Sequence, residues 1–347
     1  MIGKSITGLL CACAALCVAL SPAINATETP GIYDDGAIHV IDTIASDVVI
    51  RNNSRVSVVS GGEVRSSGAS PAVDVQDGRL IVTGTGRVVG GSATSIKGRY
   101  SKVSLARDAH VTGDIDIFGT DLSIQGNAIL DGNILGMRRL DIGGNAAVNG
   151  NISLKDQINV FLNMSGGIVR GQVEFGNIIK SAGRISGGKI LGGILGIGSP
   201  LNLKITGGEI HGGLVNRGDI INLVISGGAV FGGIDQLMRP GWNTYRIVGG
   251  SIDAYEGGYV IRADSVVGST WFNDIHISGG KLGYDNPGRG ISLGGNSNLS
   301  IYGWDLVHSD GRVTGYLSDG SRIDVALTFG DNWIGSLNLI RQDFAVQ

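Results

Sequence analysis

The feature that most constrains this chain is a motif stated three times between residues 185 and 234. Ile185, Ile205 and Ile225 each open a copy, at a spacing of 20 residues. Each copy has aliphatic residues at its first and sixth places and Gly-Gly at its third and fourth and again at its eighth and ninth. A fixed period near 20 with short apolar pieces between glycines is typical of a solenoid. We therefore expect a coil of stacked turns.

Looser copies of the motif extend over most of the chain. LSIQGNAILDGNI from Leu122 and LDIGGNAAVNGNI from Leu140 align without a gap, 18 residues apart. Further copies open at Ile247 and Ile277, where the spacing widens to 22 and then 30 residues. The extra residues, at 235–246 and 253–276, should leave the coil as loops.

The period and the residue types together favour a β-helix over other repeat folds. The leucine pattern of leucine-rich repeats is absent, as is the GGxGxD pattern of calcium-binding β-rolls. Glycine reaches positive φ without steric cost and so suits tight corners between strands. We predict an all-β, single-stranded right-handed parallel β-helix of about nine to eleven rungs. Lys189 and Glu209 occupy one repeat position and should form an exposed ladder pair.

Both ends of the coil should differ from its middle. Residues 27–54 alternate apolar and polar positions without the repeat, which predicts a cap or an irregular first rung. Residues 55–288 form the predicted β-helix. Asp310-Gly311 and Asp319-Gly320 stand between alternating apolar runs, which indicates tight hairpin turns. Residues 289–347 should therefore form a small antiparallel β module.

The first 26 residues have the organisation of a Sec-type signal peptide. Lys4 precedes an apolar run that ends at Pro22, with cleavage expected after Ala23 or Ala26. The run is short for a membrane span, so we expect no transmembrane segment once the leader is removed. The mature protein is then expected at the cell surface, outside the cell or in the periplasm.

Composition narrows the range of partners and of chemistry. The formal charge is −3 with no block of like charge, so no nucleic acid is expected as a partner. The three cysteines all lie within the predicted leader, which leaves a mature chain without thiols or disulfides. The five histidines are scattered and form no metal-binding spacing, so no structural metal and no cofactor are expected.

Three partial resemblances follow from these motifs. The copies between Val103 and Ile152 look like the rungs of bactofilins, which build a polymerising right-handed β-helix; only the fold is carried over. The ISGGxIxGG copies resemble repeats of bacterial secreted and autotransporter-type β-helices. The stretch from Leu299 through Ser321 resembles the closing segment of surface proteins with a Pro-Glu-Pro sorting tail, although this sequence contains no such tail. Together they imply a fold and an exported location but no activity.

A catalytic role is the alternative, because right-handed β-helices host polysaccharide lyases and hydrolases. Such a site would require several carboxylates at one repeat position, and the columns after the Gly-Gly pairs concentrate none. Asp274 and His276 share one strand face and are the candidate acid and base. Their convergence with Asp253, Glu256 and Asp264 would favour catalysis, and calcium would be expected only in that case.

Aromatic residues gather where the repeat becomes irregular. All four tryptophans and six of the eight tyrosines follow residue 240. Trp242, Tyr245, Tyr255 and Trp271 are the candidate ligand-binding residues, since aromatic faces in loops can stack on sugar rings or contact a protein. The alternative is that these rings fill the junction between the coil and the end module.

These observations favour an exported, non-enzymatic structural or adhesion-type surface or matrix protein. Its partners would be a glycan, a protein surface or other copies of itself. The alternative is a polysaccharide-active lyase or hydrolase whose site lies in the loops of 235–276.

Overall fold

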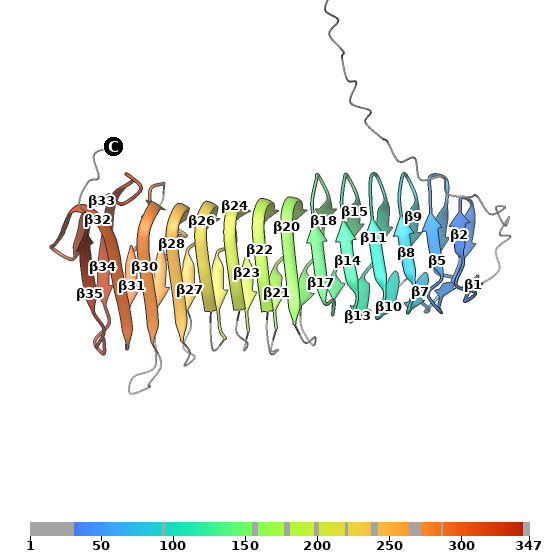
Figure 1. Cartoon of the computed structure of the whole chain (residues 1–347), viewed down its shortest axis with the longest axis horizontal. Helices are drawn as coiled ribbons and strands as arrows, with labels where there is room; N and C mark the ends of the chain where they lie inside the picture. The colour runs from blue at the N-terminus through green and yellow to red at the C-terminus, as the bar shows by residue number, and fades with distance from the viewer. Residues whose placement is uncertain are drawn as a thin grey trace, which may run out of the picture.

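The chain forms one long parallel β-solenoid of about 11 turns, closed at its C-terminal end by antiparallel strands (Figure 1). This computed structural model describes residues 31–342, apart from 92–93, 155–158, 177–180, 198–200, 219–220, 237–241, 264–271 and 286. The described residues contain strands, turns and bends but no helix. The predicted all-β, right-handed parallel β-helix is confirmed.

Successive turns stack along two hydrogen-bonded sheets. Sheet A holds β1 (Ile32–Tyr33), β4 (Val48–Ile50), β7 (Val73–Gln76), β10 (Ile96–Arg99), β13 (Ile115–Phe118), β16 (Ile134–Leu135), β19 (Ile152–Leu154), β21 (Val173–Phe175), β23 (Ile194–Gly196), β25 (Leu214–Asn216), β27 (Ile234–Gln236), β29 (Ile261–Ala263), β31 (Ile291–Leu293) and β34 (Arg322–Phe329).

Sheet B changes its construction along the axis. The N-terminal turns contribute two short strands each: β2 (Ile38–Ile41), β3 (Ile44–Ser46), β5 (Arg55–Val58), β6 (Glu63–Arg65), β8 (Arg79–Val82), β9 (Arg87–Val89), β11 (Lys102–Leu105), β12 (His110–Thr112), β14 (Asp121–Ile124), β15 (Ile129–Asp131), β17 (Arg139–Ile142) and β18 (Ala147–Val148). Later turns contribute one long strand each: β20 (Val160–Val169), β22 (Ser181–Ile190), β24 (Leu201–Ile210), β26 (Ile221–Phe231), β28 (Asn243–Asp253), β30 (Asn273–Leu282) and β32 (Ser297–Ser309).

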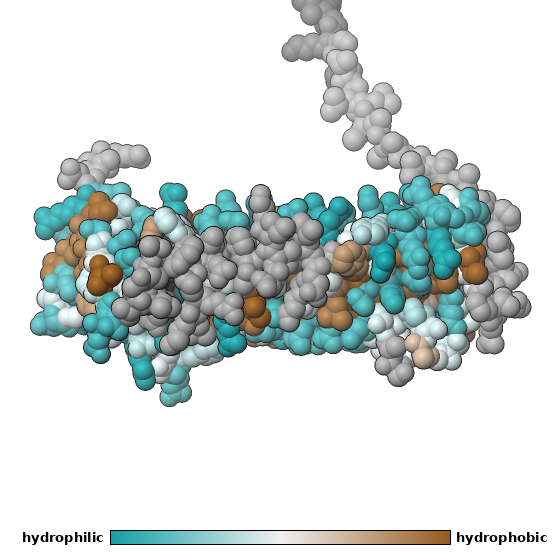
Figure 2. All heavy atoms as spheres, turned by 90° about the horizontal axis from the view of Figure 1, so that it is seen from below, coloured by the Kyte–Doolittle hydropathy of each residue, from teal (hydrophilic) through white to brown (hydrophobic). Residues whose placement is uncertain are grey.

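The outer surface therefore has three faces. The A face carries the outward side chains of sheet A. The B face carries those of β2, β5, β8, β11, β14 and β17 and of the first halves of the long strands, which pair with them in register. The C face carries those of β3, β6, β9, β12, β15 and β18 and of the second halves. Seen from below in Figure 2, the coloured surface is mostly hydrophilic, with hydrophobic residues in small separate patches.

The repeat predicts the register of the core. Ile185, Ile205 and Ile225 are direct neighbours on β22, β24 and β26, and all three are fully buried. Leu122 likewise lies opposite Leu140, as their ungapped alignment predicts. Alternation along each strand puts every second side chain into this core, as period 2 requires. Burial of each aliphatic side chain contributes about 1.5–3 kcal/mol, so stability accumulates turn by turn.

Each of the two adjacent glycines in the first Gly-Gly pair is required for its own reason. Gly188 has φ +84°, in the region that L side chains rarely adopt. Gly187 has ordinary φ, but an added Cβ would lie 2.5 Å from the carbonyl oxygen of Ser165 on the preceding turn. This pair lets the long strand bend between the B and C faces while the turns stay in close contact.

The C-terminal end closes as the Asp-Gly turns predict. β33 (Arg312–Leu317) is antiparallel to both β32 and β34, while β35 (Leu337–Arg341) lies parallel to β32. The predicted N-terminal cap segment carries strands too, because β1 pairs in parallel with β4 and β2 with β5. The predicted leader lies outside the described residues. No helix in the described part of the chain has the length and apolar character to cross a membrane.

Candidate functional site

The predicted acid and base lie side by side on the B face. Asp274 and His276 project from β30, and His276 Nε2 lies 2.9 Å from Asp274 Oδ2. The other ring nitrogen, Nδ1, lies 3.3 Å from the hydroxyl of Tyr302 on β32. Both Asp274 and His276 are about one-third exposed. The imidazole is thus held between a carboxylate and a phenol at the protein surface.

A polar hollow of about 480 Å³ surrounds this imidazole. Its lining residues come from β28, β30 and β32 and from the residue after β35: Thr244, Arg246, His276, Ser278, Tyr302 and Gln342. Arg246 lies directly opposite His276 in the sheet register. The hollow therefore offers a cation, hydroxyl groups and two rings, which are groups that bind hydroxylated and acidic sugars.

Trp242 lies at the corner that leads from sheet A into β28, two residues before Thr244. It is 51% exposed and packs against Phe272, with ring centroids 4.4 Å apart. Phe272 precedes Asp274 by two residues in the same way. The ring pair thus lies at the start of β28 and β30, the two strands that carry Thr244 and His276 into the hollow. Trp271 lies outside the described residues.

Tyr245 is in the core and not in a loop, which corrects its prediction as a ligand-binding residue. Its neighbours in register are Leu223 and Ile275, and its side chain is fully buried. The hydroxyl donates to Gln236 Oε1 at 3.1 Å, and burial raises the pKa of this phenol above its usual range. The widened spacing suggested a loop here, but the extra residues fall between β27 and β28, before Asn243.

Tyr255 is 54% exposed but has a structural contact. Its hydroxyl donates to the backbone carbonyl of His211, 3.0 Å away and two turns back along the C face. Its ring covers Gly232, where an added Cβ would lie 2.6 Å from a ring carbon. Tyr255 therefore packs over the corner after β26, within the coil, and lies on a different face from Trp242.

Of the acidic residues whose convergence with Asp274 would favour catalysis, the two that the structure describes do not gather with it. Asp253 ends β28, nine residues beyond Thr244, the residue opposite Asp274. Asp253 is buried and accepts a hydrogen bond from the backbone N–H of Asp285. Glu256 follows Asp253 in the same corner, and Asp264 lies outside the described residues. Within the described chain, no three His, Cys, Asp or Glu side chains are placed to hold one metal ion.

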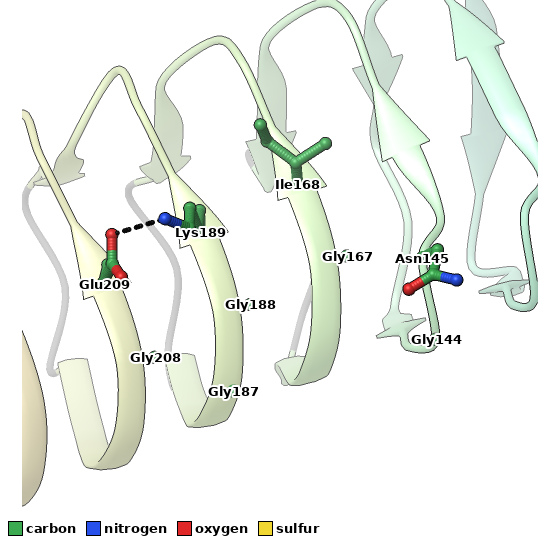
Figure 3. Close-up of a pocket in the computed structure, with 9 residues that line it drawn as sticks. All are labelled: Gly144, Asn145, Gly167, Ile168, Gly187, Gly188, Lys189, Gly208 and Glu209. Carbon is green, nitrogen blue, oxygen red and sulfur yellow. Dashed lines mark ion pairs between the residues drawn. The ribbon is translucent and has the colours of Figure 1, made fainter.

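A second surface feature follows the glycines of the C face. A shallow groove of about 510 Å³ runs across successive turns, lined largely by glycine (Figure 3). Within it Lys189 Nζ lies 2.9 Å from Glu209 Oε2, which confirms the predicted ladder pair. His211 lies 2.8 Å from the same oxygen, a partner that its separate repeat position did not predict. Hydrogen bonds from Lys189 and His211 lower the pKa of Glu209. Oε2 of this carboxylate therefore has two partners, Lys189 and His211.

Comparison with known proteins adds no relative to this description. No family model, no curated protein and no solved structure matches the chain. The resemblances to bactofilins, autotransporters and tailed surface proteins thus find no support there, and the solenoid fold is the part that is shown.

Proposed function

We propose that this is an exported, non-enzymatic structural or adhesion-type protein of the cell surface or matrix, which contacts glycans through the B face. The proposal rests chiefly on Trp242, an exposed ring that packs on Phe272 two residues before Thr244, which lines the polar hollow. An exposed aromatic face at the start of the strand that carries Thr244 and Arg246 is suited to a sugar polymer. The carbon-bound hydrogens of a sugar ring stack on the aromatic face, and its hydroxyls form hydrogen bonds. The rigid coil holds this edge in place.

The experiment combines location with binding. We expect the chain, produced with its leader in a bacterial host, to leave the cytoplasm and to lose residues 1–26 or 1–23. The purified protein should be retained on insoluble polysaccharides without releasing new chain ends. Trp242→Ala should weaken retention severalfold, whereas Tyr284→Ala, which removes a more exposed ring elsewhere, should not. Cytoplasmic retention, or equal loss in both variants, would contradict the proposal.

A specific observation also supports the enzymatic alternative. In a β-elimination on an acidic sugar, Arg246 could neutralise the carboxylate, His276 could accept the C5 proton and Tyr302 could protonate the leaving oxygen. These three side chains line one hollow. Unsaturated products from an acidic polysaccharide, lost in His276→Ala and kept in His308→Ala, would establish the lyase in place of the binding protein. His308 is exposed and does not line the hollow.

A further inference from the structure

Cations of neighbouring turns stand directly beside one another on the N-terminal part of the B face. The register places Arg55 opposite Arg79 and Arg79 opposite Lys102. Neighbouring strands lie about 4.8 Å apart, so three positive side chains project from one column within roughly 10 Å. Like charges directly opposite one another destabilise a sheet. Folding alone therefore gives no reason for this column.

Elsewhere the solenoid sets opposite charges side by side. On the A face Lys97 lies between Asp74 and Asp116, and on the C face Glu63 lies opposite Arg87. Among the described strands, one other register pairs like charges, that of Arg184 with Lys204. It lies on the B face as well, one column over and closer to Arg246. The exceptions to charge alternation thus share a single face.

A set of described cations on the B face forms no ion pairs, although carboxylates are present on the same face. Lys102 lies opposite Asp121 in the sheet register, but this carboxylate is bound by Arg138 instead. The set comprises Arg55, Arg79, Lys102, Arg184, Lys204 and Arg246. Within the described chain none of their side chains forms an ion pair or a hydrogen bond.

The carboxylates of the B-face strands are each bound by another residue. Asp121 is held by Arg138 at 2.8 Å, Asp141 by Arg139 at 2.7 Å and Asp274 by His276 at 2.9 Å. Six cations remain available on one face of a chain whose formal charge is −3.

The N-terminal column also borders a hollow of about 580 Å³. Four cations line it, namely Arg55, Arg79, Lys102 and Arg138, against the two carboxylates of Asp77 and Asp121. Tyr100 stands in its wall, 62% exposed, at the corner position that Trp242 occupies further along. An exposed aromatic ring thus occurs at the same corner position at two points along the B face.

We propose that the B face binds a linear acidic polysaccharide that lies along the solenoid axis. Its carboxylate or sulfate groups would relieve the repulsion between Arg55, Arg79 and Lys102, and its sugar rings would contact Tyr100 and Trp242. This deepens the proposed function, on which it rests, by naming the class of glycan. A nucleic acid is disfavoured because nucleic-acid-binding domains are usually strongly basic, whereas this chain has a pI near 5.9.

The test compares two triple variants with the same change of net charge. Arg55→Gln, Arg79→Gln and Lys102→Gln together remove the B-face column. Arg87→Gln, Lys97→Gln and Arg99→Gln remove three cations from the C and A faces of the same turns. Binding of the full mature chain is measured by calorimetry with a polyuronate, a sulfated polysaccharide, a neutral polysaccharide and single-stranded DNA, at low and physiological salt.

We expect the wild type to prefer the acidic polysaccharides, with affinity that falls as salt rises because exposed charges are screened. The B-face variant should lose roughly tenfold or more of this affinity and become less sensitive to salt. The A- and C-face variant should lose much less. Equal loss in both variants, equal binding of neutral and acidic polymers, or tighter binding of DNA would each overturn the proposal.

Two further results separate this proposal from the one on which it rests. A polyuronate long enough to span from Arg55 to Arg246, roughly 40 Å over nine strand spacings, should bind more tightly than a short oligomer. Equal affinities of the long polyuronate and the short oligomer would count against a binding surface that extends along the solenoid axis. The protein could also be retained on neutral glycans in a way that depends on Trp242 but not on the cations. That result would support the proposed function and contradict the proposal of an acidic ligand.

Discussion

At the scale of single residues, glycine decides whether the turns can stack. Alanine at position 188 would have two costs. Its Cβ would lie 2.5 Å from the Gly166 carbonyl oxygen, and its backbone would have to adopt a φ of +84°. Gly257 has a similar φ of +71° but no atom within 4 Å of an added Cβ. The two positions therefore separate the cost of the backbone conformation from the cost of contact between turns.

We expect Gly188→Ala to destabilise the protein by about 3 kcal/mol or more, and Gly257→Ala by about 1–2 kcal/mol. The excess at Gly188 reports the clash with the preceding turn. Chemical denaturation followed by circular dichroism measures both. Similar losses at the two sites would show that the turns separate readily, contrary to this explanation.

At the scale of strands, buried amides link the corners of successive turns. Asn243 Nδ2 donates to Asn273 Oδ1 at 2.7 Å, and Asn273 Nδ2 donates to the hydroxyl of Ser297 at 3.0 Å. Asn216 in turn donates to Gln236 and Asn243. All of these side chains are buried. The ladder gives most of these buried polar groups a partner, although Gln236 Nε2 has none among the described residues.

Asn243→Ala should therefore cost about 1–3 kcal/mol of stability, because it leaves the buried Asn273 carbonyl without its donor. Asn222→Ala, one turn earlier but exposed on the B face, should change stability by less than about 0.5 kcal/mol. Thermal denaturation of the two variants checks this. A loss of stability in Asn222→Ala as large as that in Asn243→Ala would contradict the explanation that Asn243 stabilises the fold through its buried hydrogen bonds.

At the scale of the whole molecule, the last turn of the solenoid must be covered so that a second chain does not pair with its open strands. Open strand edges and an uncovered apolar core promote association between chains. β34 covers β31, β35 covers β32, and β33 ties β32 to β34. The Asp-Gly hairpins thus convert a stack that could continue into one that stops.

A chain that ends at Ser309 lacks β33, β34 and β35, and its last turn is exposed. We expect the molecular mass of this truncated chain to rise with protein concentration because its copies associate. Under the same conditions the mass of the full chain should stay constant. Size-exclusion chromatography with light scattering provides the measurement. A truncated chain of unchanged mass would indicate that β31 and β32 do not form a productive edge.

The sequence determined the solenoid because its information is local and repeated. Ile185, Ile205 and Ile225 could be aligned without a structure, and a period of 20 fixes which residues stack. The Asp-Gly pairs likewise predicted an antiparallel closure. The widened spacings indicated where residues leave the coil, but they could not say which ones. The spacing alone therefore predicts a loop at Tyr245, although this residue belongs to the core.

Only the tertiary structure decided which side chains share a face. The spacing between Arg55, Arg79 and Lys102 is irregular, at 24 and 23 residues, so their column is invisible until strand pairing fixes the register. The separation of Asp253 from Asp274 and the contact of Tyr302 with His276 follow from the same three-dimensional register. A repeat specifies its own core, whereas the outward positions are free of that constraint, and their neighbours are set by how the turns stack.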